Sequence, residues 1–171
     1  VDGARLAYSL ASPANDVSLA DVARLSDVFY IGGTKCGTLF GEAVVIPDGG
    51  SIRQFVTQMK QHGALLAKGR LLGVQFEALF EDGLYSTIGQ PGVESTRRIR
   101  EALIRAGYVV TMDSPTNLTF VALDQAGHER LSRKVRYGIW ETLPDGRLLA
   151  RFCTSWGTPE EDIKAFEAAL A

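Results

Sequence analysis

Residues 27–46, DVFYIGGTKCGTLFGEAVVI, decide the fold class and place Lys35 among glycines between two apolar runs. The runs at 27–32 and 42–46 both predict short buried strands. A lysine ammonium is costly to bury unless it is paired or converted covalently into another group. Lys35 therefore requires a chemical explanation.

The composition is that of an ordinary globular protein. The 171 residues are 46% hydrophobic and 22% charged, which is enough to build a real core. The formal net charge of -2 leaves no electrostatic footprint for nucleic acid, so no DNA or RNA partner is expected. No apolar run reaches the length of a membrane span, so no membrane partner is expected either.

Two cysteines, Cys36 and Cys153, are too few for a disulfide framework in a chain of this length. They favour a reducing compartment, and we expect a cytoplasmic protein. Cys153 is expected to be a small core residue. His62 and His128 lack metal-like partners in the sequence, so no metal site is predicted.

Helical and strand patterns alternate along the chain, which predicts an α/β architecture. Expected helices cover 18–25, 51–80, 91–105, 126–137 and 158–170, with a break in the second near Gly63, Gly69 or Gly73. Expected strands cover 27–32, 42–46, 108–112, 116–124, 138–143 and 148–156, the last two flanking a hairpin signature at 144–147. Trp140 and Trp156, at strand ends, are predicted to be core or interface residues.

Four stretches together resemble the low-specificity threonine aldolases of the β-eliminating lyase group. They are VDGARLAYSL (1–10), DVFYIGGTKCGTLFGEAVVI (27–46), MKQHGALLAKGR (59–70) and RFCTSWGTPEEDI (151–163). These relatives are pyridoxal-phosphate enzymes of fold type I, the aspartate-aminotransferase-like class. The resemblance follows the family's order along nearly the whole chain and covers only the C-terminal half of such an enzyme.

The resemblance implies a division into two parts. Residues 1–107 would be the C-terminal part of the cofactor-binding large domain, and residues 108–171 a small C-terminal α/β domain. The opening VDGARL reads as the end of a strand whose beginning lies elsewhere. We therefore expect a gene product of about twice this length, consistent with one large enzyme subunit.

Position by position, the resemblance assigns cofactor contacts to the first part of the chain. Lys35 matches the lysine that forms the Schiff base with the cofactor aldehyde, for which a neutral amine is the nucleophile. Asp2 matches the aspartate that pairs with the pyridine nitrogen and keeps the ring protonated. Arg5, in the same DGAR, matches an arginine that helps to hold the substrate carboxylate.

Three further basic residues are matched in the same way. Arg151 corresponds to the small-domain arginine that takes the substrate carboxylate, a task that suits a planar guanidinium. Lys60 stands where the family often has an arginine that reaches the cofactor phosphate of a neighbouring subunit. Arg53 stands where many relatives have a basic residue near the active site, although the QFVTQ that follows departs from their glycine-rich pattern.

The implied activity is retro-aldol cleavage of threonine-like β-hydroxy-α-amino acids to glycine and an aldehyde, with pyridoxal 5'-phosphate as cofactor. The complete enzyme is expected to be a homodimer or homotetramer. The 171-residue piece alone is expected to be inactive. The catalytic base is not visible in this sequence.

Several alternatives stay open at this point. The same fold hosts β-eliminating lyases and aminotransferases, and the chain could act as a non-catalytic assembly module. Without the resemblance, Lys35 reads as a solvated turn lysine, Asp2 and Arg5 as a surface ion pair, and Arg151 as an exposed cross-strand charge. A phosphate-loop interpretation of GGTKCGT fails, because the glycine directly before the lysine and the hydroxyl residue directly after it are missing.

Overall fold

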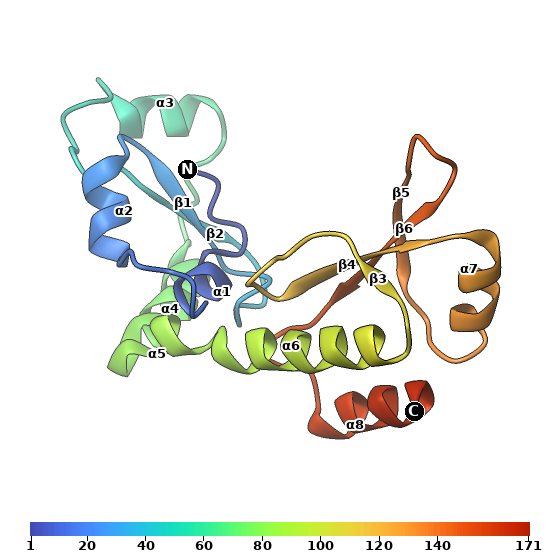
Figure 1. Cartoon of the computed structure of the whole chain (residues 1–171). Coiled ribbons are helices and arrows are strands. Elements are labelled where there is room, and N and C mark those ends of the chain that lie inside the picture. Colours follow the sequence, from blue (N-terminus) through green and yellow to red (C-terminus); the bar gives the residue numbers. More distant parts are fainter. The chain divides into compact units, whose positions relative to one another are not determined.

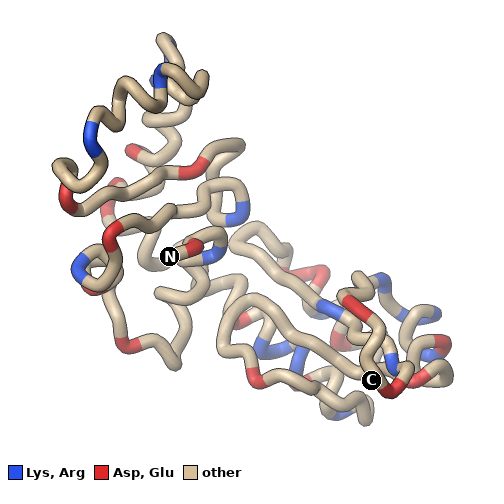
Figure 2. Tube along the Cα trace, turned by 90° about the horizontal axis from the view of Figure 1, so that it is seen from above, with Lys and Arg blue, Asp and Glu red and all other residues tan.

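The computed structural model describes all 171 residues, which form two compact units. The first unit comprises Val1–Leu10 and Asn15–Ile88, and the second comprises Ala11–Ala14 and Gly89–Ala171. Both are mixed α/β structures, as the alternating patterns predict. Lys and Arg as well as Asp and Glu occur in both units (Figure 2), which agrees with the small net charge.

The first unit is built around a two-stranded antiparallel sheet (Figure 1). Strand β1 (Phe29–Gly32) pairs with β2 (Glu42–Val45), so that the two strands flank the glycine-containing loop. The helices are α1 (Leu6–Leu10), α2 (Leu19–Leu25), α3 (Phe55–Gln61), α4 (Arg70–Phe80) and α5 (Leu84–Thr87), with a 3₁₀ turn η1 (Glu81–Gly83) before α5. The loop that carries Lys35 is therefore anchored by strands at both ends.

Local sequence signals explain several boundaries in this unit. Ser18 and Asp21 form a reciprocal capping box at the start of α2. The helical pattern predicted over 51–80 is interrupted between α3 and α4, where Gly63 and Gly69 lie, which confirms the expected break. The prediction of a buried second strand is wrong, because β2 alternates between exposed and half-buried residues and Val44 is 60% exposed.

The first residues run alongside β1 without forming a regular strand. The Tyr30 amide donates to the Val1 carbonyl at 3.2 Å, and the Gly32 amide donates to the Gly3 carbonyl at 2.9 Å. These bonds, two residues apart on both segments, resemble strand pairing. They place residue 2 beside the strand that leads into the lysine loop.

The second unit contains a four-stranded antiparallel sheet in the order β3-β4-β6-β5 (Figure 1). Its strands are β3 (Val109–Val110), β4 (Leu118–Leu123), β5 (Gly138–Thr142) and β6 (Leu148–Cys153), and its helices are α6 (Gln90–Arg105), α7 (Gln125–Ser132) and α8 (Glu160–Leu170). The predicted hairpin is present, since β5 and β6 pair around the turn at Pro144 to Arg147. Cys153, expected in the core, is instead exposed at the end of β6.

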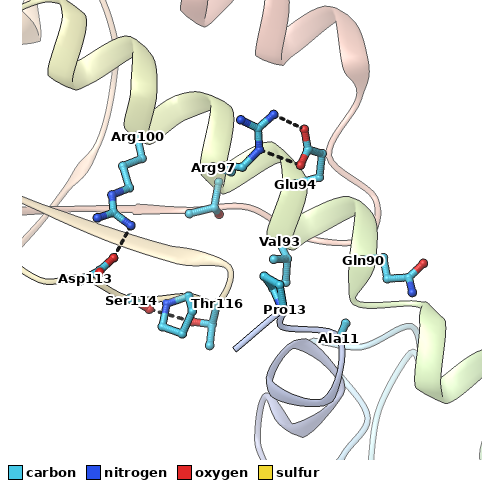
Figure 3. Close-up of a pocket in the computed structure, with 12 residues that line it drawn as sticks. Ala11, Pro13, Gln90, Val93, Glu94, Arg97, Arg100, Asp113, Ser114 and Thr116 are labelled. Atoms are coloured by element: carbon cyan, nitrogen blue, oxygen red, sulfur yellow. Dashed lines mark hydrogen bonds and ion pairs between the residues drawn. The ribbon is translucent and has the colours of Figure 1, made fainter. Parts of the chain in front are cut away.

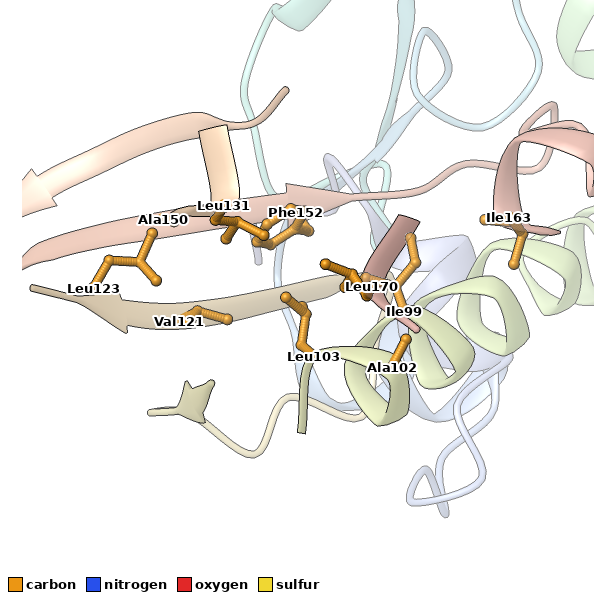
Figure 4. Close-up of a cluster of buried hydrophobic side chains, with 10 residues drawn as sticks. All are labelled: Ile99, Ala102, Leu103, Val121, Leu123, Leu131, Ala150, Phe152, Ile163 and Leu170. Carbon is orange, nitrogen blue, oxygen red and sulfur yellow. The ribbon is translucent and has the colours of Figure 1, made fainter. Parts of the chain in front are cut away.

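The core of this unit lies between one face of the sheet and the helices (Figure 4). It is a cluster of buried side chains comprising Ile99, Ala102, Leu103, Val121, Leu123, Leu131, Ala150, Phe152, Ile163 and Leu170. Because side chains alternate along a strand, the neighbours Phe120 and Arg151 face the opposite side of the sheet.

Helices α6 and α8 lie side by side (Figure 1) and are joined by two ion pairs, which we call the Arg98 clamp. The Arg98 guanidinium pairs with Glu160 at 2.7 Å and with Glu167 at 2.6 Å. This packing places α6 within the second unit, whereas we assigned residues up to 107 to the first domain. The division at 107/108 stays a prediction about the domains of the whole protein.

None of the helices combines the length and the apolar character that a membrane crossing requires.

Candidate active site

The loop after β1 holds Lys35 by its backbone and leaves its side chain exposed. The Gly33 carbonyl accepts from the amides of Cys36 at 2.9 Å and Thr38 at 3.1 Å, which closes a tight turn. The Cys36 side chain is fully buried and anchors the turn in the unit. The structure therefore presents the Lys35 amine to solvent from a fixed backbone.

Tyr8 fixes the lysine backbone from a second direction. Its ring is 1% exposed, and its hydroxyl donates to the Lys35 carbonyl at 2.5 Å. Tyr8 belongs to α1, so this bond connects the helix to a residue 27 positions later. No local sequence pattern relates Tyr8 to this loop, so the sequence alone does not identify it as a site residue.

Two glycines allow the first segment to touch β1 directly. A Cβ at Gly3 would overlap the Tyr30 carbonyl oxygen, and a Cβ at Gly32 would lie 2.6 Å from the Ala4 carbonyl oxygen. Any larger residue at either position would force the two backbones apart. The close approach brings Asp2 to the strand that leads to Lys35.

The Asp2 carboxylate is exposed and is held by hydrogen bonds from two sides. The Tyr30 hydroxyl donates to it, and the Ala4 amide donates to its Oδ1 atom at 3.0 Å. These two bonds, aided by the positive charge of Lys35, hold the pKa of Asp2 below its usual value. The same bond raises the pKa of Tyr30 to about 12. Asp2 is thus an oriented carboxylate that stays ionised at neutral pH.

Arg5 lies close to the same loop. Burial raises the pKa of the Cys36 thiol, and the positive charges of Arg5 and Lys35 oppose this increase. Arg5 itself is half-buried next to α1. The structure therefore brings three of the predicted residues, Asp2, Arg5 and Lys35, to one end of β1.

Lys60 and Arg53 are not joined to this group by hydrogen bonds or ion pairs. Lys60 is an exposed residue in the last turn of α3. Arg53 is exposed ahead of the same helix, and its carbonyl accepts from the Gln58 side chain at 2.8 Å. Their roles toward a phosphate or a substrate stay predictions.

Arg151 lies in the second unit, in the middle of β6, opposite Phe120 of β4 and Gly138 of β5. It is half-buried, and its guanidinium carbon lies 4.6 Å from the centre of the Trp140 ring. Arg151 forms no ion pair with an acidic side chain. Its donors are thus free of a competing carboxylate.

A separate cavity of about 490 Å³ opens between the start of α6 and the β3–β4 connection of the second unit (Figure 3). Arg97 pairs with Glu94 at 2.6 Å, and Arg100 pairs with Asp113 at 2.5 Å, within its wall. The sequence did not predict this cavity. None of the predicted site residues lines it, and its arginines are already neutralised by acids.

Comparison with known proteins gives a consistent result. No protein-family profile matches the chain. The threonine aldolase of Leishmania major superposes with a TM-score of 0.90 at 40% identity over 99% of the chain. The low specificity L-threonine aldolase of Pseudomonas sp. (strain NCIMB 10558) is 26% identical over 175 residues. The chain is similar to threonine aldolases.

This similarity covers about half of each relative. The chain spans 49% of the length of both aldolases, matching the C-terminal half of the Leishmania protein. A serine palmitoyltransferase from Sphingomonas wittichii, 16% identical with a TM-score of 0.63, shares the fold alone. The α/β fold is that of the fold type I pyridoxal-phosphate enzymes, as the resemblance predicts.

The residues at the end of β1 fit pyridoxal phosphate. Lys35 supplies an exposed amine that suits the cofactor aldehyde, and Asp2 supplies an ionised carboxylate that suits the ring nitrogen. The backbone around them is crowded, since a Cβ at Gly33 would overlap the Thr38 hydroxyl and lie 2.7 Å from the Gly41 carbonyl oxygen. Glycine at position 33 is therefore required for the loop around Lys35 to pack in this conformation.

Proposed function

We propose that this chain is the C-terminal part of a pyridoxal-phosphate-dependent carbon–carbon lyase that cleaves threonine-like β-hydroxy-α-amino acids to glycine and an aldehyde. The observation that carries the proposal is the convergence of Lys35 and Asp2 at one end of β1, in a chain 40% identical to a threonine aldolase. The proposal concerns the complete protein, because the chain spans about half of its relatives.

Lys35 and Asp2 would hold the cofactor at its two reactive positions. The Lys35 amine would bind the aldehyde carbon, and its backbone, fixed by Tyr8 and the Gly33 turn, would set the position of that bond. The Asp2 carboxylate would keep a proton on the ring nitrogen, a task for which its low pKa is suited. When bound, pyridoxal phosphate supplies an acceptor for the electron pair of the breaking carbon–carbon bond.

Arg5 and Arg151 would bind and orient the substrate carboxylate. A guanidinium forms two parallel hydrogen bonds to a carboxylate and so fixes both its position and its rotation. That orientation decides which bond at the α-carbon is broken. The proton of the substrate β-hydroxyl must pass to a base outside the residues assigned so far, and the aldehyde then leaves.

We further propose an oligomeric state, a compartment and a domain division for the complete protein. Lys60 would reach the cofactor phosphate of a neighbouring subunit, and Arg53 would add positive charge near the site, so the complete enzyme would be a homodimer or homotetramer. No disulfide joins Cys36 and Cys153, which is consistent with a cytoplasmic protein. We propose that residues 1–107 and 108–171 belong to the large and small domains, and that the 171-residue piece alone is inactive.

The reaction class is tested with the complete protein, pyridoxal phosphate and L-threonine. We expect acetaldehyde and glycine in equal amounts, and loss of both products in a Lys35→Gln variant. A Lys68→Gln variant is the matched control, because Lys68 is exposed in the same unit and has no proposed role. Ammonia or a keto acid in place of acetaldehyde would contradict the lyase assignment and favour β-elimination or transamination.

A further inference from the structure

The face of the second sheet opposite the core carries a group of side chains around Arg151. Phe120 lies beside Arg151 on β4, and Gly138 lies beside it on β5. A Cβ at Gly138 would meet nothing within 4 Å, so the space on that side of Arg151 is open. A half-buried guanidinium without an acidic partner is thus accessible from one flank.

A β-bulge in β5 brings an aromatic ring to the same face. The register changes between Ile139, which pairs with Ala150, and Glu141, which pairs with Leu149, so that Trp140 is the extra residue. Bulges of this kind change the direction of a side chain and are frequent near functional sites. The Trp140 ring centre lies 4.6 Å from the Arg151 guanidinium carbon, within cation–π range.

Phe120 in turn supports the indole. Its ring packs edge-on against Trp140, with centres 6.1 Å apart and planes at 76°. Phe120 is 7% exposed, whereas Trp140 is 55% exposed. The buried Phe120 ring therefore lies beneath the Trp140 ring, which faces solvent. The bulge and the edge-on contact with Phe120 together limit the orientations that the Trp140 indole can take on this edge strand.

We propose that Trp140 is a positioning residue that holds the Arg151 guanidinium in the orientation needed to bind the substrate carboxylate. The inference rests on the proposed role of Arg151. A guanidinium over a ring face keeps the N–H groups along its edge available for a carboxylate. An acidic partner would hold the arginine equally well but would occupy those donors, which explains why an aromatic residue serves here.

The test uses the complete protein without added pyridoxal phosphate, so that L-threonine can bind but is not cleaved. The signal of Trp140 is the part of the tryptophan fluorescence response that is lost in Trp140→Phe. L-threonine should change this signal in a saturable way, and L-threoninamide, which lacks the carboxylate, should not. An equal response to both compounds, or no response to either, would overturn the proposal.

Calorimetric titration with L-threonine then separates positioning from folding. Trp140→Leu should weaken binding about two- to fivefold, the value of an exposed cation–π contact, and Trp140→Phe should retain part of the affinity. Ile139→Ala is the matched control, because Ile139 lies on the same strand, is 44% exposed and is paired with the core-facing Ala150. It should leave the affinity unchanged.

The outcomes distinguish this inference from the proposed function. If Arg151→Lys weakens binding and Trp140→Leu does not, Arg151 keeps its role and the positioning role of Trp140 is wrong. If neither variant affects binding, the assignment of Arg151 is wrong as well. The cofactor role of Lys35 is tested separately by chemical labelling. Neither of these two outcomes therefore contradicts that role.

Discussion

Deletion of the Tyr8 hydroxyl should make the loop that carries Lys35, between β1 and β2, open more often. The Tyr8→Phe variant keeps the buried ring but deletes the hydroxyl that donates to the Lys35 carbonyl at 2.5 Å. A partly buried carbonyl that loses its donor costs about 1–2 kcal/mol, because water replaces the bond only in part. Opening of the loop should therefore become about 5- to 30-fold more frequent.

Hydrogen exchange followed by mass spectrometry measures this opening directly. The informative amides are those of Cys36 and Thr38, which donate to the Gly33 carbonyl and close the turn. They should exchange faster in Tyr8→Phe by the factor given above. Amides in the second unit should exchange at the wild-type rate, which separates local opening from global unfolding.

Tyr85→Phe provides the matched control. Tyr85 is also 1% exposed and lies in the same unit, but its hydroxyl lies near the Ala7 backbone and makes no hydrogen bond to the Lys35 carbonyl. Removal of that hydroxyl should leave exchange in the lysine loop unchanged. Equal acceleration in both variants, or none in Tyr8→Phe, would refute the view that the Tyr8 hydroxyl fixes the loop.

Two further predictions concern the charged groups. Arg98→Met should lower the melting temperature of the protein by a few degrees, measured by calorimetry, because it leaves Glu167 without its partner between α6 and α8; an unchanged melting temperature would contradict the clamp. Ultraviolet absorbance should show one tyrosine that ionises near pH 12, and Asp2→Asn should return its pKa toward 10. Since the pKa of Tyr30 is raised on folding, the stability from its bond is present below about pH 10 and is lost as the pH rises through about 12. A titration curve that Asp2→Asn leaves unchanged would show that Asp2 does not hold Tyr30.

The sequence was most informative where chemistry and local pattern coincide. A lysine among glycines between two apolar runs marked the loop at residue 35, and the capping box at Ser18 marked the start of a helix. The pairing of Asp2 with that loop was available only through the resemblance, because 33 positions separate Asp2 from Lys35. The structure gives it a physical reason in the glycine contacts between the first segment and β1.

Other features depend on tertiary packing and were missed. The bond from Tyr8 to the Lys35 carbonyl has no signal in either local sequence. Trp140 was expected in the core or at an interface; it is 55% exposed and so is not a core residue of this chain, its ring lies beside Arg151, and the interface expectation stays a prediction. An apolar residue on an edge strand can satisfy the same pattern as a buried one, and Cys153 shows the same ambiguity at the end of β6.

The central claim is that Lys35 is the residue that binds pyridoxal phosphate. The most direct measurement is reduction of the protein with borohydride after addition of pyridoxal phosphate, followed by peptide mapping by mass spectrometry. We predict a pyridoxyl group on the peptide that contains Lys35 and none above background on those that contain Lys60 or Lys68. Equal labelling of the three lysines, or no label on Lys35 in the complete protein, would contradict the account.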